Sequence, residues 1–383
     1  MNGMKWSMFV AVAVVVFAGS LATCRARGEA TEQPAKRQID LTICLDTSGS
    51  MSGLINAARQ KLWDIVNELA LARPAPELRV ALIAYGSPAY ANPSYIAGQV
   101  GLTNDLDTVY QKLMALKTTG GDEYVGCVVH EAVTTLSWST SKEALKIIFV
   151  AGNESADQAR QRHDYRTACA DAIAKGIIVN SIYCGNATDG IAPGWQEVAR
   201  LADGHFAAID QNNGTVVFST PFDDKIAALN AKLNETYVPF GANGKAGAAN
   251  QVAQDTNSSS LGSSSLASRA VTKANGFYSN GAWDIVDARK EKDFDLATLE
   301  KEDLPENMQK MSLEEQKAHL DKMDQQRQVV QQEINDLATQ RRDYVQVEQK
   351  KLAEKGQHSL DNAMIEAMHR QAEKAEFSFE DKF

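Results

Sequence analysis

The stretch Asp46-Thr47-Ser48-Gly49-Ser50 decides how the fold of this 383-residue chain is interpreted. An apolar run from Ile39 to Leu45 precedes it, and an amphipathic segment that begins near Leu54 follows it. A strand is therefore expected to end at an Asp-x-Ser-x-Ser loop, with a helix beginning just after it. The loop offers one carboxylate and two hydroxyls on a tight turn that Gly49 permits. Hard divalent cations prefer such oxygen ligands, and a site with so little charge suits a cation that keeps waters or takes a partner's ligand.

Composition narrows the classes of protein to consider. The formal net charge of −10 argues against nucleic acid as the main partner, because phosphate binding needs clustered Lys and Arg. No nucleophile–base pair, catalytic-metal cluster or phosphate-binding loop is visible, so an enzyme is not expected. The cysteines match no zinc or redox spacing, and buried thiols are expected, with one disulfide among the last three as the alternative. They are Cys24, Cys44, Cys127, Cys169 and Cys184.

Residues 1–30 are expected to be a signal peptide or an N-terminal anchor. Lys5 precedes an apolar run from Met8 to Ala22, which suits the h-region of a signal peptide and is short for a membrane span. The protein is therefore expected to be exported to a periplasm, a cell envelope or the extracellular space. No later stretch of the sequence is apolar and long enough to span a bilayer, so a membrane would be met only through this segment.

Residues 38–238 alternate between strand-like and helix-like stretches. Strands are expected at 39–45, 78–85, 95–102, 145–150, 176–183 and 205–209, with 95–102 at an edge. Helical patterns lie between them, at 54–72, 106–116, 123–136, 156–175, 195–202 and 222–233. This alternation predicts an α/β fold with a mainly parallel sheet covered by helices on both faces. Ligands bind such sheets at the carboxyl ends of strands, and Asp46 lies at one.

Three of the expected loops resemble the metal-ion-dependent adhesion site of von Willebrand factor type A domains. Asp46 to Gly53 matches the first site loop. Thr118 to Glu123 stands where the family has a Gly-Gly-Thr type loop, and Phe149 to Glu154 stands where many members have Thr-Asp-Gly. The sequences of the third loop and of 177–185 resemble those of a bacterial exported branch of this family. The resemblance implies a Rossmann-like type A domain over 38–238.

The resemblance also implies that a divalent cation, Mg²⁺ or in its place Mn²⁺ or Ca²⁺, binds at these loops. Aligning the second loop puts Asp122 at the usual Thr position, with Thr119 as a nearby alternative. In the third loop Gly152 occupies the slot of the usual Asp, with Asn153 and Glu154 beside it. The site would thus gain a charge on one loop and lose one on another. The candidate metal ligands are therefore Asp46, Ser48, Ser50, Asp122 and Asn153.

The function that this resemblance implies is divalent-cation-dependent binding of a protein, for adhesion or assembly at the cell envelope. A carboxylate of the partner would complete the shell of the metal. Two alternatives stay open. In one, the oxygens of Asp46 to Ser50 only cap the next helix. In the other, the protein is an envelope scaffold that binds through its C-terminal helices and has a degenerate metal site.

Composition changes after Tyr237. The stretch 241–273 is rich in Gly, Ala, Ser, Asn and Gln, and it is expected to be a flexible linker. A short aromatic and charged segment follows at 274–311, where the patch around Trp283 is expected to dock on a surface.

Residues 312–383 are expected to be helical. Ser312 and Glu315 fit a capping box at the start of a long helix, whose apolar stripe needs cover. Arg327 and Arg341 fall on the stripe and would have to extend their charged heads out of the seam. A second helix at 360–375 is expected to fold back as a hairpin. A coiled coil with a second chain, and hence a homo-oligomer, is the alternative.

Overall fold

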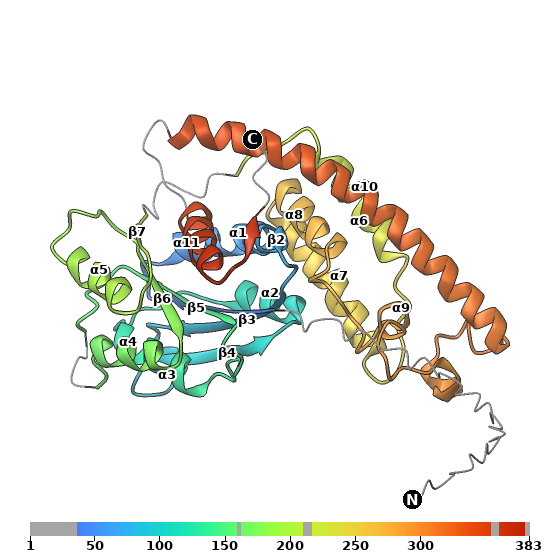
Figure 1. The fold of residues 1–383 in the computed structure, drawn as a ribbon, viewed down its shortest axis with the longest axis horizontal. Coiled ribbons are helices and arrows are strands. Elements are labelled where there is room, and N and C mark those ends of the chain that lie inside the picture. The colour runs from blue at the N-terminus through green and yellow to red at the C-terminus, as the bar shows by residue number, and fades with distance from the viewer. Residues whose placement is uncertain (1–36, 159–161, 210–216, 354–359, 380–383) are drawn as a thin grey trace, which may run out of the picture. The chain divides into compact units, whose positions relative to one another are not determined.

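The six strands predicted for the first part of the chain form one sheet in the order β4-β3-β1-β5-β6-β7 (Figure 1). All neighbours are parallel except β4, which pairs antiparallel with β3 at one edge, as expected for 95–102. The strands are β1 (Gln38–Asp46), β3 (Glu77–Tyr85), β4 (Ile96–Thr103), β5 (Leu145–Gly152), β6 (Ile177–Tyr183) and β7 (Phe206–Ala208). The mainly parallel α/β fold is confirmed.

This computed structural model describes residues 37–158, 162–209, 217–353 and 360–379. The expected targeting segment and Cys24 lie outside these residues. Within them, no helix combines the length and the apolar character needed to cross a membrane.

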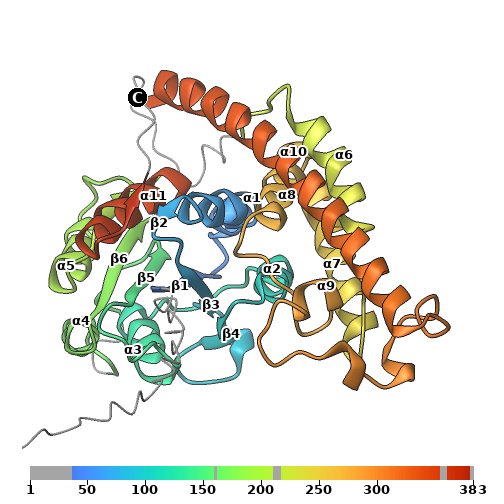
Figure 2. The ribbon, with the colours of Figure 1, turned by 45° about the vertical axis from the view of Figure 1, so that its right-hand side comes forward.

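Helices cover both faces of the sheet (Figure 2). One face packs against α1 (Ser52–Leu69), α2 (Leu106–Ala115) and α11 (Leu360–Lys374). The other packs against α3 (Val125–Thr135), α4 (Tyr165–Ala174) and α5 (Ala192–Leu201). The helix expected over 156–175 begins only at Tyr165, because the Asp164 side chain accepts a hydrogen bond from the Arg166 backbone N–H and caps it there.

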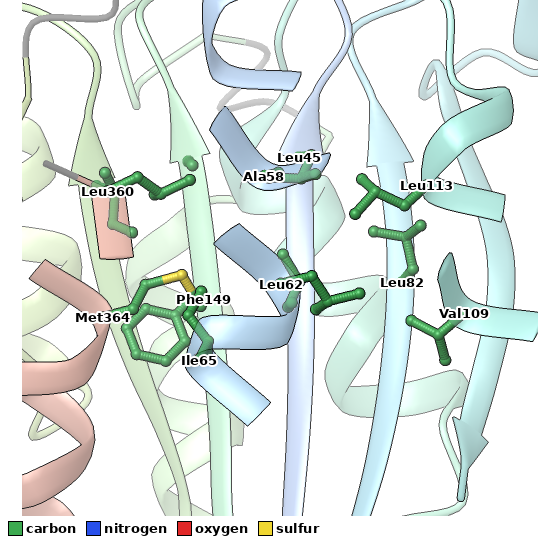
Figure 3. Close-up of a pocket in the computed structure, with 13 residues that line it drawn as sticks. Leu45, Ala58, Leu62, Ile65, Leu82, Val109, Leu113, Phe149, Leu360 and Met364 are labelled. Atoms are coloured by element: carbon green, nitrogen blue, oxygen red, sulfur yellow. The ribbon is translucent and has the colours of Figure 1, made fainter. Parts of the chain in front are cut away.

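Helix α11 comes from the far end of the sequence but completes the face that α1 covers. Figure 3 shows its Leu360 and Met364 beside Phe149 of β5 and Ile65 of α1. An apolar cavity of about 20 Å³ remains among these side chains. A cavity so small and without polar partners is expected to stay dry. Helix α11 therefore belongs to the core of the sheet region.

The flexible linker expected over 241–273 is wrong. This stretch forms α7 (Gly244–Ser260) and α8 (Ser263–Ala274), which pack against each other, and α8 packs on α1 and on α6 (Asp223–Asn234). Small side chains allow these helices to approach closely: a Cβ on Gly247 would lie 2.4 Å from the Trp283 ring. Polar side chains are satisfied inside the contact, as where Trp63 Nε1 donates to Ser258 Oγ at 3.2 Å. Low hydrophobicity here marks a polar core and not a disordered segment.

The expected hairpin between the last two long helices is also wrong. Helix α10 (Leu313–Ala353) is one continuous helix of 41 residues, but α6, α8 and α9 (Ile285–Ala288) cover its stripe. Arg327 does not extend into solvent: its Nη1 is 2.7 Å from Asp284 and 3.0 Å from Asp287, and the three side chains are buried. Arg341 likewise pairs with Asp223 at 2.8 Å. Buried ion pairs therefore anchor this helix together with apolar side chains such as Leu320 and Ile334.

Two local expectations for the C-terminal part are confirmed, whereas a homo-oligomer through these helices stays a prediction. The Ser312 backbone N–H donates to the Glu315 carboxylate at 2.7 Å, and the Glu315 N–H donates to Ser312 Oγ at 3.3 Å, so the capping box is confirmed. Trp283 is buried and packs beside Tyr237, with ring centroids 5.6 Å apart.

A small antiparallel sheet of β2 (Ala72–Arg73) and β8 (Ser378–Phe379) joins the segment after α11 to the segment after α1. Lys36–Phe383 group into one compact unit. The domain limit at 238 stays a prediction.

The four cysteines in the described part of the chain are buried and free. The alternative of a disulfide among Cys127, Cys169 and Cys184 is therefore wrong, and the expectation of buried thiols is confirmed for these residues and Cys44. Burial raises the pKa of the Cys169 thiol to about 12 and that of Cys44 further still, so both are inert small hydrophobes at neutral pH.

Candidate metal centre

The first loop brings its three predicted ligands together at the carboxyl end of β1, in the middle of the sheet. Ser48 donates from its backbone N–H to Asp46 Oδ1 at 2.7 Å and from its Oγ to Asp46 Oδ2 at 3.3 Å. The Oγ atoms of Ser48 and Ser50 lie 3.5 Å apart. Asp46 and Ser48 are buried and Ser50 is exposed, so the three oxygen donors run from the sheet to the surface.

The capping alternative for this loop is wrong. Helix α1 begins after Met51, and no side chain caps it. The Asp46 carboxylate is held instead by the N–H two residues further on, within the loop itself. The loop side chains are therefore not needed to start the helix and remain available for a ligand.

The third loop supplies an amide and cannot supply a carboxylate at the usual place. Asn153 Nδ2 donates to Ser50 Oγ at 3.0 Å, while its Oδ1 is buried and has no hydrogen-bond partner among the described residues. A Cβ on Gly152 would lie 2.4 Å from Tyr85 Oη and 3.4 Å from the Asp46 Cβ. Tyr85 is fixed there because its hydroxyl donates to the Ala151 carbonyl at 2.9 Å. An aspartate at position 152 therefore has no room.

The second loop does not place Asp122 against the first loop. Asp122 is exposed, and its carboxylate accepts a hydrogen bond from the Tyr124 hydroxyl at 2.9 Å. The Thr119 hydroxyl is engaged with Ser87 Oγ, and its backbone N–H donates to the Thr47 carbonyl at 2.9 Å. The Glu154 side chain is exposed and accepts from Gln158 at 3.3 Å. As a metal ligand, Asp122 stays a prediction that these contacts do not favour.

Glu123 is the residue that sequence reasoning missed. It is only 2% exposed, and its carboxyl group lies close enough to interact with that of Asp46. Its Oε2 also accepts from the Glu154 N–H at 3.1 Å. Gly86 makes room for the pair, since a Cβ there would lie 2.5 Å from Asp46 Oδ1 and 3.2 Å from the Glu123 Cγ. The signal in the sequence was the pair of adjacent acids at 122 and 123, of which only one can face the sheet.

The electrostatics of this acid pair favour a bound positive charge. Burial, and then the hydrogen bond and the charge of Glu123, raise the pKa of Asp46 to about 9. Hydrogen bonds from Ser48 oppose this shift, and neither Asp46 nor Glu123 forms an ion pair with a Lys, Arg or His of the described residues. No group of three or more His, Cys, Asp or Glu side chains in the described ranges is placed to hold a metal ion. A cation here would therefore rely on two carboxylates, hydroxyls, an amide oxygen and water, which are the ligands of Mg²⁺ and Mn²⁺. The residues present fit such an ion.

Comparison with known proteins agrees with this geometry at the level of the domain. Residues 40–191 match the family model of the von Willebrand factor type A domain. A search of curated proteins finds no match to the chain.

Several solved structures are similar to parts of the chain. One is proximal thread matrix protein 1 from the mussel byssus with a zinc-occupied MIDAS motif: 13% identity, 45% of this chain, 42% of that chain, TM-score 0.36. A von Willebrand factor type A protein from Catenulispora acidiphila has 14% identity over 46% of this chain and 40% of that chain, with a TM-score of 0.35. Manganese-loaded Plasmodium vivax TRAP protein has 16% identity over 46% of this chain and 70% of that chain, with a TM-score of 0.33. The chain spans about two fifths of the length of the mussel protein. On the family match and the sheet order, residues 40–191 form a von Willebrand factor type A domain.

Proposed function

We propose that this domain binds a divalent cation of the Mg²⁺ and Mn²⁺ class at the carboxyl end of β1 and uses it to bind a protein partner. Asp46, Ser48 and Ser50 would hold the ion, with Asn153 Oδ1 accepting from water beside it. When bound, the ion would supply an open position for a carboxylate of the partner. The observation that carries the proposal is the buried pair of Asp46 and Glu123, which forms no ion pair with a basic side chain among the described residues.

Glu123 takes over the charge that the third loop lacks. Tyr85 and Gly152 leave no space for the usual aspartate, whereas Glu123 reaches the same carboxylate, Asp46, from the second loop. A cation would neutralise both carboxylates, which removes the cost of two buried like charges. The number of acidic groups thus equals that of the usual site, with one of them moved between loops.

The proposed role is that of an interaction module and not of an enzyme, and the proposed location is the cell envelope. The location rests on the apolar run from Met8 to Ala22 alone. The alternative of a scaffold that binds through 312–383 needs free helices. It is not favoured, because α11 packs on the sheet and α10 packs on α6 and α8.

Titration of the full chain with Mn²⁺ tests the site, by calorimetry and by the paramagnetic resonance of the free ion. We expect Asp46→Asn to abolish binding and Glu123→Gln, which keeps the shape and removes the charge, to weaken it at least tenfold. Asp122→Asn is the matched control one residue away, and it should change the affinity less than twofold because its carboxylate is exposed and, among the described residues, accepts a hydrogen bond from Tyr124 alone.

Each contrary result has a distinct meaning. No Mn²⁺ binding by the unaltered chain sinks the proposed function. If Asp122→Asn loses Mn²⁺ binding and Glu123→Gln keeps its affinity, Asp122 and not Glu123 is the metal ligand of the second loop. Near-unchanged circular dichroism is required of all three variants, since Glu123 also accepts the Glu154 N–H.

A further inference from the structure

A large cleft lies away from the metal centre, between the sheet region and the long helix α10. Its volume is about 810 Å³, within the range of ligand-binding pockets. One wall is the second half of α1 from Lys61 with the turn after it, together with α11, and the other is α8 with the second half of α10. The metal centre lies at the opposite end of α1, where that helix begins (Figures 1 and 2). The cleft is therefore a separate site.

Helix α10 crosses the cleft and touches the opposite wall at two places. Arg341 Nη1 lies 3.7 Å from Asp64 Oδ1 on α1, and Gln349 Nε2 donates to Asn362 Oδ1 on α11 at 3.1 Å. These positions are eight residues apart, which is about 12 Å along a helix. Between them, Arg342, Val345 and Gln346 line the cleft. The space under α10 is thus held open by polar contacts at two points and is not filled by packed side chains.

Each acidic side chain that lines the cleft contacts a basic side chain. Asp64 and Asp361 share Lys61, whose Nζ lies 3.5 and 3.0 Å from them. Glu68 accepts or donates a hydrogen bond with His369 Nε2 at 2.9 Å. These acidic side chains are therefore already engaged within the cleft, although the chain as a whole carries a net charge of −10.

Two of the basic groups that line the cleft are not neutralised. Arg342 is half-buried and pairs with no carboxylate of the described residues. Arg73 donates only to the backbone carbonyls of its own turn, at 3.0 to 3.3 Å, and it also has no carboxylate partner within the described ranges. A guanidinium that lines a groove without an acidic partner is suited to bind a carboxylate of a ligand in a bidentate manner.

We propose that this cleft binds a short acidic peptide segment of a protein partner, whose carboxylates pair with Arg342 and Arg73. Side-chain amides such as Asn335 and Gln346 offer both donors and acceptors, as a peptide backbone requires. Val345 and Ile365 offer apolar contact to the side chains between the acids. The free charges of the cleft are positive in an acidic chain, so a basic segment is disfavoured and an acidic one is attracted.

Fluorescence anisotropy of the full chain tests the cleft with a labelled eight-residue peptide of alternating Glu and Leu. We expect salt-sensitive binding that EDTA does not change, which separates this site from the proposed metal centre. Arg342→Glu should weaken binding at least tenfold. Lys350→Glu is the matched control, because it makes the same charge change on the same helix but does not line the cleft. It should alter the affinity less than twofold.

Other results would overturn the proposal. Equal weakening by Arg342→Glu and Lys350→Glu would show attraction by the general charge of α10. Equal binding of the peptide with Gln in place of Glu would exclude carboxylate recognition, and full displacement by millimolar pyrophosphate together with that result would assign the arginines to phosphate. Arg342 forms no ion pair in the described structure, so the fold should survive its change; Arg342→Gln provides a second, milder variant, expected to weaken binding in the same direction.

Discussion

Helix α1 is held on its two sides by different kinds of contact. Toward the sheet it buries apolar side chains, among them Leu62 and Ile65, against β-strands and α11. Toward α7 and α8 it presents Trp63 and Asn67, whose partners are polar: Trp63 Nε1 donates to Ser258, and Asn67 Nδ2 donates to the Ser268 carbonyl at 2.8 Å. The first contact is non-directional and grows with the apolar area buried, whereas the second depends on each donor meeting its acceptor.

The polar side is organised around Arg269, which is fully buried. Its Nη1 is 2.5 Å from Asp107 of α2, its Nε is 2.5 Å from Asp255 of α7, and its guanidinium carbon lies 5.0 Å from the Trp63 ring. Tyr278 donates to the other oxygen of Asp107 at 2.6 Å. One cation thus joins the sheet region to two helices that follow it by more than a hundred residues, and its removal leaves buried acids behind.

The largest expected effect comes from breaking this centre. Arg269→Met keeps the volume but leaves Asp107 buried without its cation, and we expect the free energy of unfolding to fall by about 3–5 kcal/mol. Urea denaturation at neutral pH measures it. A polar centre further predicts that adding Asp107→Asn to Arg269→Met restores part of the loss, because the unpaired charge is gone. If the two losses simply add, the contact behaves like the apolar side of α1 and the comparison fails.

Lowering the pH should weaken the polar side of α1 but not its apolar side. The expected loss of stability is smaller than that of Arg269→Met. Burial opposes ionisation of Asp255, but Lys273 and Arg269 outweigh it and lower the pKa of this carboxyl from 3.8 to about 2. A carboxyl with a depressed pKa in the folded state stabilises the protein above the unfolded pKa and loses that contribution as pH falls through the folded one. The window is therefore about pH 4 to 2, and the loss is about 2 kcal/mol.

Asp255→Asn provides the reference for this measurement. The difference in melting temperature between the unaltered chain and the variant should be largest above pH 4 and should shrink as pH falls toward 2. A difference that stays constant over this range would mean that the ion pairs of Asp255 contribute nothing that titrates. Apolar contacts such as those of α11 carry no such dependence, since they contain no group that binds a proton in this range.

The same contrast explains how much of the fold the sequence could predict. Residues Leu41, Ile43 and Leu45 of β1 face α1 while Cys44 faces α3, and such runs of apolar residues predict strands of a doubly covered sheet from local pattern alone. In α7 the buried side chains include Gln251, Gln254, Asp255 and Ser258. Their pattern resembles a linker, because the contacts that satisfy them are tertiary: the partner of Ser258 is Trp63, 195 positions away.

In the candidate site, too, the residues that local sequence could predict differ from those that depend on tertiary contacts. The first loop could be predicted because Asp46, Ser48 and Ser50 are neighbours in the chain and approach each other by local hydrogen bonds. Glu123 could not, because only the start of α3 at Val125 decides which of two adjacent acids turns toward the sheet. That Gly152 removes the third-loop carboxylate was visible in the sequence, but the reason, Tyr85 from the neighbouring strand, requires the structure.

The smallest expected effect belongs to the feature that local sequence predicts best. Ser312 Oγ accepts from the Glu315 N–H at the exposed start of α10, and Ser312→Ala should lower the free energy of unfolding by about 1 kcal/mol, with no change in the cooperativity of the transition. Ser312→Asp, which can still accept that bond, should restore it. A loss as large as that of Arg269→Met would mean that the first turn of α10 limits the stability of the whole helix. We expect instead that α10 is held by Arg327 and Arg341, whose carboxylate partners lie 40 or more positions away, so that a frayed first turn leaves the rest of the helix in place.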